Sequence, residues 1–135
     1  MVCAGDGFSV ETEMDVEPWM EGGPGVIHGG VLSTAFDEVM GTAPYLIGPA
    51  AVTVHLEVDF RAPVPIGSRL HLSARLLGQQ RRKIYVEAAA HLGDPDKPAA
   101  VGHSIFVSIR AREHFADHLD KSQMADEYKQ RLLGR

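Results

Sequence analysis

The stretch that decides the fold is PGVIHGGVLSTAFDEVMG, residues 24–41. From residue 31 onward its apolar side chains recur one, three or four positions apart, which predicts a helix with one broad buried face. The apolar set is Val31, Leu32, Ala35, Phe36, Val39 and Met40. Gly41 and Pro44 predict the end of this helix. An apolar face of this width indicates that the helix is buried against another layer of the structure.

The opposite face of the same helix carries small residues around one carboxylate. At about 100° per residue, that face holds Gly30, Ser33, Thr34, Asp37 and Gly41. A helix face that only meets water is typically rich in Lys, Glu, Arg or Gln, so this stripe indicates close approach by another backbone or by a ligand. Asp37, in the middle of the stripe, is the first candidate for chemistry.

The loop before the helix supplies a second candidate element. Residues 18–30 contain five glycines and two prolines, which predicts a shaped loop that ends at Gly29 and Gly30. A helix that opens on glycines leaves free N–H groups at its positive end, an arrangement suited to an oxyanion. Asp37 lies seven residues beyond Gly30, about 10 Å along a helix axis. One reacting carbonyl cannot touch both groups, so their joint action would require two subunits.

The rest of the chain alternates between apolar and polar residues in five further segments. We expect strands over about 8–16, 51–61, 68–77, 82–92 and 99–109. The first would be edge-like, and the last four, joined by short turns, would form an antiparallel meander. The charged segment 113–133 predicts one or two surface helices. We therefore expect an α+β class and a single domain over residues 1–135.

Composition narrows the function classes. The chain is 44% hydrophobic and 23% charged, as expected for a globular domain that buries a core. No apolar run approaches the roughly 20 residues of a membrane span, and no secretory signal pattern opens the chain, so we expect a cytoplasmic protein without membrane partners. The single cysteine, Cys3, argues against a disulfide framework, a cysteine-rich zinc site and redox chemistry. We expect no metal.

Charge is distributed unevenly along the chain. Residues 1–60 hold ten acidic residues and no Lys or Arg, while residues 61–135 hold eight acidic and thirteen basic residues. The net charge of -5 argues against nucleic-acid binding. The excess of basic residues in 61–135 is still compatible with a local site that binds a phosphorylated small molecule.

Two segments together resemble the hotdog-fold acyl-CoA thioesterases, most closely the PaaI-like branch and the related human thioesterase superfamily proteins. The first is residues 24–37, with a His-Gly-Gly that begins at His28 and an Asp nine residues later. The second is VTVHLEVDFRAP, residues 52–63, a strand pattern that ends in a proline-containing turn. The resemblance covers roughly residues 18–110. It implies an antiparallel sheet wrapped around a central helix, with the segment at 113–133 as a C-terminal helical extension.

The resemblance also implies an assembly and a reaction. Members of this family form homodimers whose sheets join edge to edge, usually paired into tetramers, with two active sites across each dimer interface. The reaction is hydrolysis of an acyl-CoA to a free acid and coenzyme A, without a separate cofactor because coenzyme A is part of the substrate. This assembly agrees with the distance between Gly30 and Asp37.

By the same resemblance, individual residues receive roles. The N–H of Gly29 or Gly30 would polarise the thioester carbonyl, and His28 would shape that loop. Asp37 of the partner subunit would act as general base or direct nucleophile, and the Thr53 hydroxyl would help to hold the attacking water. The run Arg81, Arg82 and Lys83 follows a predicted turn, where similar proteins approach the nucleotide end of the ligand.

Several alternatives stay open at this point. Many relatives carry an Asn several residues before the His, where this loop has Gly22 and Gly23, so a noncatalytic acyl-CoA binding or sensing module is a second reading. A hotdog dehydratase is a third, although its Asp and His motif is absent. Glu38 is an alternative base, and the run of Arg81 to Lys83 is equally typical of a solvated turn. Acyl preference, tetramer arrangement and pathway are not fixed by the sequence.

Overall fold

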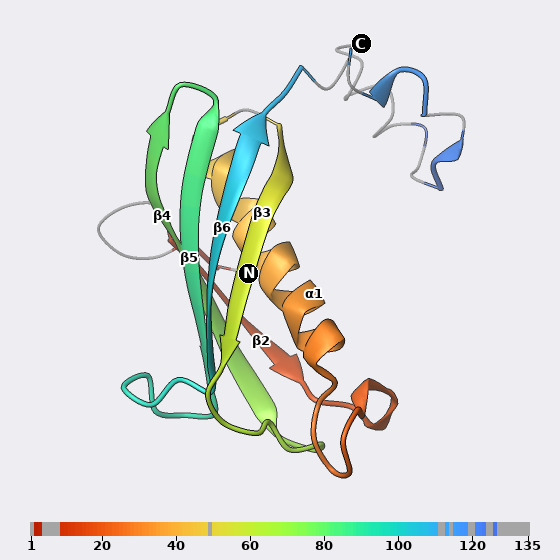
Figure 1. Cartoon of the computed structure of the whole chain (residues 1–135), viewed down its shortest axis with the longest axis vertical. Helices are drawn as coiled ribbons and strands as arrows, with labels where there is room; N and C mark the ends of the chain where they lie inside the picture. The colour runs from red at the N-terminus through yellow and green to blue at the C-terminus, as the bar shows by residue number, and fades with distance from the viewer. Residues whose placement is uncertain are drawn as a thin grey trace.

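The computed structural model describes residues 2–3, 9–48, 50–110, 113, 115–118, 121–123 and 126. Within them a six-stranded antiparallel sheet lies against one long helix, α1, which spans Gly29–Thr42 (Figure 1). The strands are β1 Val2–Cys3, β2 Ser9–Asp15, β3 Ala51–Phe60, β4 Arg69–Gln80, β5 Lys83–His91 and β6 Ala100–Ser108. Short 3-10 helices, η1 and η2, occupy Pro18–Met20 and Ala43–Leu46. The α+β class and the hotdog arrangement are confirmed.

The strand order corrects the predicted meander. The sheet runs β1-β2-β4-β5-β6-β3, so of the four strands in the predicted meander only β4, β5 and β6 are neighbours in sequence order, while β3 pairs with β6. The reason is that residues 61–68 do not form a tight hairpin. They pair instead with the loop before α1: Ile27 N–H donates to the Val64 carbonyl at 2.9 Å, and Ile66 N–H to the Gly25 carbonyl at 2.9 Å. The prediction that the first strand is an edge is also wrong, because β1 pairs with β2.

The helix buries the face that its sequence pattern indicates. Leu32, Phe36, Val39 and Met40 are at most 2% exposed, and Val31 and Ala35 pack partly buried against the core. The predicted end at Gly41 is early, because the helix continues to Thr42 and passes into η2, in which Pro44 occupies one of the first two positions. Phe36 approaches the sheet at Gly102, where a Cβ would lie 2.9 Å from the ring.

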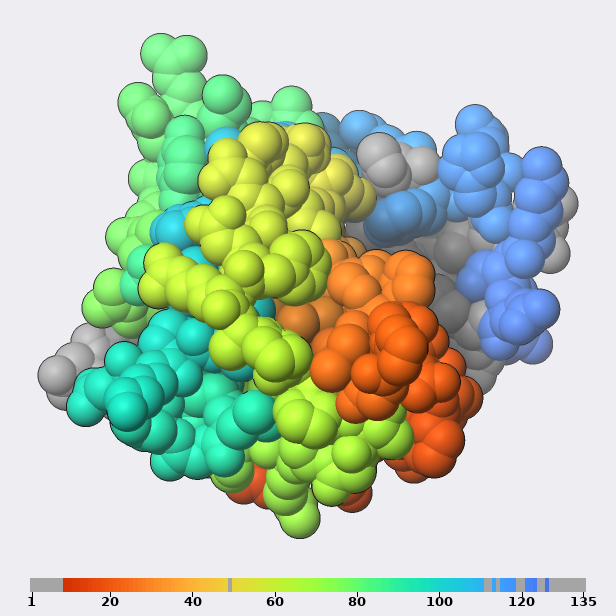
Figure 2. Space-filling model, turned by 60° about the horizontal axis from the view of Figure 1, so that its bottom comes forward, coloured from red at the N-terminus to blue at the C-terminus, as the bar shows by residue number. Residues whose placement is uncertain are grey.

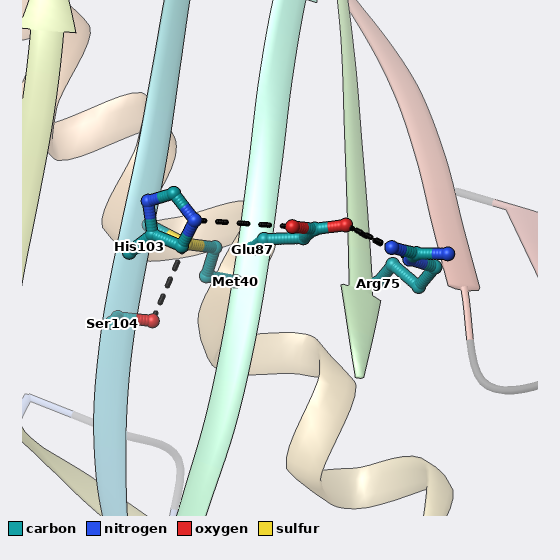
Figure 3. Close-up of polar contacts among 5 residues, drawn as sticks. All are labelled: Met40, Arg75, Glu87, His103 and Ser104. Carbon is teal, nitrogen blue, oxygen red and sulfur yellow. Dashed lines mark hydrogen bonds and ion pairs between the residues drawn. The ribbon is translucent and has the colours of Figure 1, made fainter. Parts of the chain in front are cut away.

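The two faces of the sheet differ in chemistry. On β5, alternate residues from Ile84 onward are buried beneath α1, as expected for a strand with one core face. The other face is polar: the Arg75 guanidinium pairs with Glu87, and His103 Nε2 lies 3.8 Å from the same carboxylate (Figure 3). On the buried side of β6, the Ser104 hydroxyl donates to Met40 Sδ at 3.3 Å.

The predicted C-terminal helical extension, 113–133, falls mostly outside the described residues. Among the helices that are described, none is both long enough and apolar enough to cross a membrane.

Candidate active site

The helix begins with a histidine cap. His28 has extended backbone angles (φ -68°, ψ 133°), and its Nδ1 accepts a hydrogen bond from the Gly30 N–H at 2.8 Å. An acceptor at Nδ1 requires the ring proton on Nε2, so the imidazole does what a Ser or Asp cap usually does. This bond uses the Gly30 N–H. In the described part of the chain, the Gly29 N–H has no acceptor, as expected for the first residue of a helix.

The loop that leads into the helix is packed tightly around His28. The His28 N–H donates to the Met20 carbonyl at 2.7 Å, and the Gly22 N–H donates to the Val26 carbonyl at 3.0 Å. A Cβ on Gly22 would lie 2.6 Å from the His28 Cα, closer than real Cβ atoms come to backbone. Glycine at this position is therefore required by packing, and the loop as it stands does not accommodate an Asn there.

Gly29 opens into a cavity of about 430 Å³ at the end of the sheet. Apart from Gly29 itself, the lining residues are Val26, Ile27, Leu32, Phe60, Arg61, Ala62, Pro63 and Val64. Figure 2 shows this end of the molecule, where the orange segment leading into α1 lies beside the yellow-green segment that follows β3. The cavity therefore combines mostly apolar side chains with one free backbone donor and one guanidinium.

Asp37 and Thr53 meet directly. The Thr53 hydroxyl donates to Asp37 Oδ1 at 2.9 Å, which joins the third turn of α1 to the first half of β3. Asp37 is partly exposed, and the neighbouring Glu38 is exposed. Both line a second cavity of about 390 Å³ that also includes Thr53 and Tyr45. The carboxylate is thus held in position while remaining open to solvent and ligands.

A β-bulge makes the Asp37 contact possible. Thr53 pairs with Phe106 and His55 with Ile105, so Val54 is the extra residue in β3. In a regular strand, residues three apart face opposite sides of the sheet. The bulge changes this alternation and lets Thr53 face α1 on the same side as Leu56, which pairs with the buried Ser104.

Within one chain, the two halves of the candidate site are separate. Asp37 lies eight residues beyond Gly29, about 12 Å of rise along the helix. Two hydroxyls between them, on Ser33 and Thr34, donate to the Gly29 and Gly30 carbonyls at 2.9 Å each. The side chains on this face of the helix are therefore short and lie close to the helix backbone.

The basic run lies at the other end of the sheet from the Gly29 cavity. Arg81 and Arg82 form the turn between β4 and β5, with Arg81 in the left-handed region at φ 57°. The Arg82 guanidinium donates to the Ser108 carbonyl at 3.0 and 3.1 Å. Lys83 faces away from α1, because the next residue, Ile84, is buried. Of the two halves of the site the run lies nearer to Asp37, because Ile84 pairs with Phe106, which pairs with Thr53. Phosphate binding by these residues stays a prediction.

Sequence reasoning missed Arg61 at the cavity of Gly29. A signal was available, because Arg61 is the first Lys or Arg in the chain after sixty residues without one. Phe60, the residue before Arg61, lines the same cavity.

The sheet order and the long helix along one face define the hotdog fold. Residues 24–99 match the family model of the thioesterase superfamily, and the chain belongs to that superfamily.

Comparisons with individual proteins agree with this family. The chain is 29% identical over 96 residues to acyl-coenzyme A thioesterase THEM5 of Mus musculus, an alignment that covers 71% of this chain and 39% of the relative. A thioesterase superfamily protein from Shewanella loihica has a TM-score of 0.65 at 26% identity, covering 78% of this chain and 87% of that one.

An acyl-CoA hydrolase of Staphylococcus aureus, solved in complex with butyryl coenzyme A and coenzyme A, shares the fold with a TM-score of 0.70 at 21% identity, covering 75% of this chain and 65% of that one. The chain spans about two fifths of the length of the curated relatives it matches.

Proposed function

We propose that this protein hydrolyses acyl-CoA thioesters to a free acid and coenzyme A. The observation that carries the proposal is the partly exposed Asp37 carboxylate, held by the Thr53 hydroxyl at 2.9 Å on the central helix of a thioesterase superfamily fold. The substrate class is supported by the curated relatives, which are named acyl-coenzyme A thioesterases.

The chemistry needs one base and one oxyanion donor, because a thioester is already activated. In the proposed reaction the Asp37 carboxylate takes a proton from a water molecule, whose oxygen attacks the thioester carbonyl. The Gly29 N–H of the partner subunit stabilises the negative charge that develops on the carbonyl oxygen. The carbon–sulfur bond then breaks, and the proton on Asp37 passes to the departing thiolate. Direct attack by Asp37, through an anhydride that water then hydrolyses, is the alternative route.

The choice of Gly29 over Gly30 follows from the cap. The Gly30 N–H already donates to His28, whereas the Gly29 N–H has no acceptor in the described part of the chain, and Gly29 lines a cavity with mostly apolar walls. A hydrogen bond to a developing oxyanion is worth more in such surroundings than in water. No Asn amide adds a second donor from position 22, because packing of Gly22 against His28 excludes a side chain.

A homodimer through β3 would bring the two halves of the site together. β3 is the last strand of the sheet, and its outer edge is unpaired within the described residues. Val54 and Phe60 on this strand are 56% and 55% exposed. A long, partly apolar edge is a template for pairing with a second strand. Pairing of these dimers into a tetramer, and membership of the PaaI-like branch, stay predictions.

The test is coenzyme A release from a panel of short, medium, long and aromatic acyl-CoAs, with a blank for the thiol of Cys3. We expect Asp37→Asn to lower kcat by on the order of 100-fold or more while the protein stays folded, because Asn can still accept the Thr53 hydrogen bond. Glu38→Gln is the matched control, since it removes the adjacent exposed carboxylate and should keep activity.

Two results would overturn the proposal. A Glu38→Gln variant that loses activity while Asp37→Asn keeps it would move the base to Glu38. No turnover of any acyl-CoA, with saturable binding to both wild type and Asp37→Asn, would make the protein a noncatalytic acyl-CoA binding module.

A further inference from the structure

The rim of the Gly29 cavity holds a guanidinium with no ionic partner in the described part of the chain. Arg61 follows β3 directly, and its backbone N–H is fixed by the Ala99 carbonyl at 2.8 Å. Its side chain is exposed. Four other described arginines are engaged: Arg69 with Glu13, Arg75 with Glu87, Arg110 with Glu113, and Arg82 with the Ser108 carbonyl. Arg81, in the turn between β4 and β5, shares with Arg61 the lack of a side-chain partner in the described part of the chain. Arg61 is therefore held in place by its backbone but free at its charged end.

Arg61 also lies between two hollows of different character. It lines the mostly apolar cavity that contains Gly29, and it lines a second hollow of about 450 Å³ on the polar face of the sheet. In that second hollow, the small side chains of Ser73 and Ala89 occupy paired positions on β4 and β5 and leave space above the strands. Arg61 thus borders both the mostly apolar cavity of Gly29 and the polar face of the sheet.

This arrangement matches the two chemical parts of an acyl-CoA. The acyl group and the pantetheine arm carry no phosphate, while the nucleotide end carries all the phosphates of the molecule. A thioester placed at the Gly29 N–H would have its uncharged arm among the apolar walls and its phosphates at the exit. A guanidinium binds phosphate oxygens with paired hydrogen bonds and a full charge, which a neutral side chain cannot do.

We propose that Arg61 binds a phosphate of the coenzyme A moiety, and that it is the residue through which this site prefers coenzyme A esters to thioesters of shorter thiols. The inference rests on the proposed function, because it assumes that the thioester lies at Gly29. It differs from the expectation for Arg81 to Lys83. Within one chain, those residues lie near Ser108, which pairs with Ala51 at the start of β3, about 30 Å along the strand from Phe60. In the proposed dimer they would reach this site only from the partner subunit.

The experiment compares wild type with Arg61→Gln on three thioesters of one acyl group: the acyl-CoA, the acyl-3′-dephospho-CoA and the acyl-pantetheine. We expect Arg61→Gln to raise KM for acyl-CoA on the order of tenfold with little change in kcat, as is typical for loss of a charged hydrogen bond. Kinetics on acyl-pantetheine should match wild type. The defect should shrink as ionic strength rises, because salt screens the wild-type contact.

Lys97→Gln is the matched control. It removes one positive charge from the exposed loop between β5 and β6, at the same end of the sheet as Ala99, and no side-chain contact of Lys97 is found in the described part of the chain. Equal effects of Lys97→Gln and Arg61→Gln would reduce the result to general attraction of an anion and overturn the proposal. A rise in KM for acyl-CoA in Arg81→Gln or Lys83→Gln, and not in Arg61→Gln, would also overturn the proposal.

The substrates separate the remaining outcomes. If Arg61→Gln impairs acyl-pantetheine as much as acyl-CoA, Arg61 acts at the thioester and not at a phosphate. If the defect appears only with acyl groups that end in a carboxylate, the anion recognised is on the acyl chain. Either result rejects phosphate binding. Normal handling of the 3′-dephospho substrate by wild type, with the Arg61→Gln defect retained, would assign the contact to the diphosphate.

Calorimetric binding of free coenzyme A and of pantetheine distinguishes failure of this inference from failure of the proposed function. Wild type that binds coenzyme A without hydrolysing its esters would reject the thioesterase proposal, and a weaker affinity of Arg61→Gln for coenzyme A would still support the role of Arg61. Active wild type with equal affinity in Arg61→Gln would reject only that role.

Discussion

The two ends of the small-residue face of α1 provide different kinds of functional group. At its first turn, the functional group is the Gly29 N–H, a backbone donor beside a histidine-capped Gly30 and at a cavity lined mostly by apolar side chains. Two turns later it is the Asp37 carboxylate, a side chain held by the Thr53 hydroxyl at an open surface. The donor at Gly29 depends on the conformation of the loop before the helix. The carboxylate depends on which side chains stand at positions 37 and 53.

This difference determines how each end can be tested. A carboxylate can be neutralised by one conservative substitution, as with Asp37→Asn. A backbone donor survives most substitutions and is removed only by proline, which lacks the N–H. Gly29 permits this change because it is the first helical residue, where proline is well tolerated, and because His28 before it is already extended.

The largest effect is expected for Gly29→Pro. Loss of one oxyanion donor should lower kcat by on the order of 100-fold or more, with the helix intact by circular dichroism. Gly29→Ala is the control, because it keeps the N–H and its Cβ would meet the Phe60 ring at an ordinary 3.5 Å. Steady-state hydrolysis of one acyl-CoA measures both. Equal activity of the two variants would show that the Gly29 N–H is not the oxyanion donor.

Mixing the two inactive variants tests whether the ends act across subunits. Gly29→Pro and Asp37→Asn, dissociated and reassociated at equal amounts, should regain about a quarter of wild-type activity, because half of the dimers are mixed and each mixed dimer has one intact site. Measuring activity before and after exchange gives the result. If exchange is demonstrated by mass labelling and activity does not return, both groups act within one chain.

The positions of Gly29 and Asp37 on the helix could largely be predicted from the sequence, because both follow from local spacing. The apolar period places Phe36 in the core and Asp37 beside it on the other face, and a pair of glycines after His28 marks a helix start. These inferences need only the geometry of one helix. They do not depend on how distant strands pair.

The parts that could not be predicted depend on long-range pairing. The position of β3 beside β6 arises because residues 61–68 pair with the loop before α1, which no local turn signal shows. The bulge at Val54 likewise depends on the partner strand. The packing of Gly22 against His28 leaves no room for a side chain at position 22, which the sequence alone does not show.

Substitution of Thr53 tests how much the Asp37 end of the helix depends on the hydroxyl that holds the carboxylate. Thr53→Val keeps the shape and removes the hydroxyl that donates to Asp37 Oδ1, so kcat should fall on the order of tenfold, less than for loss of the carboxylate. Thr53→Ser restores a donor and should recover most of the rate. The readout is kcat for one acyl-CoA under saturation. A Thr53→Val variant as active as wild type would show that Asp37 needs no positioning by this hydroxyl.

The smallest effect is expected at the backbone end, from the cap itself. His28→Ala leaves the Gly30 N–H without its acceptor and should lower the free energy of unfolding by about 1 kcal/mol, whereas His28→Asn offers another capping oxygen and should cost less. Urea unfolding measures the stabilities, and hydrolysis measures the site. If the cap holds the Gly29 N–H in place, His28→Asn should be more active than His28→Ala. An active His28→Ala with reduced stability would confine His28 to folding, and the loop around Gly22 would then be what positions the donor.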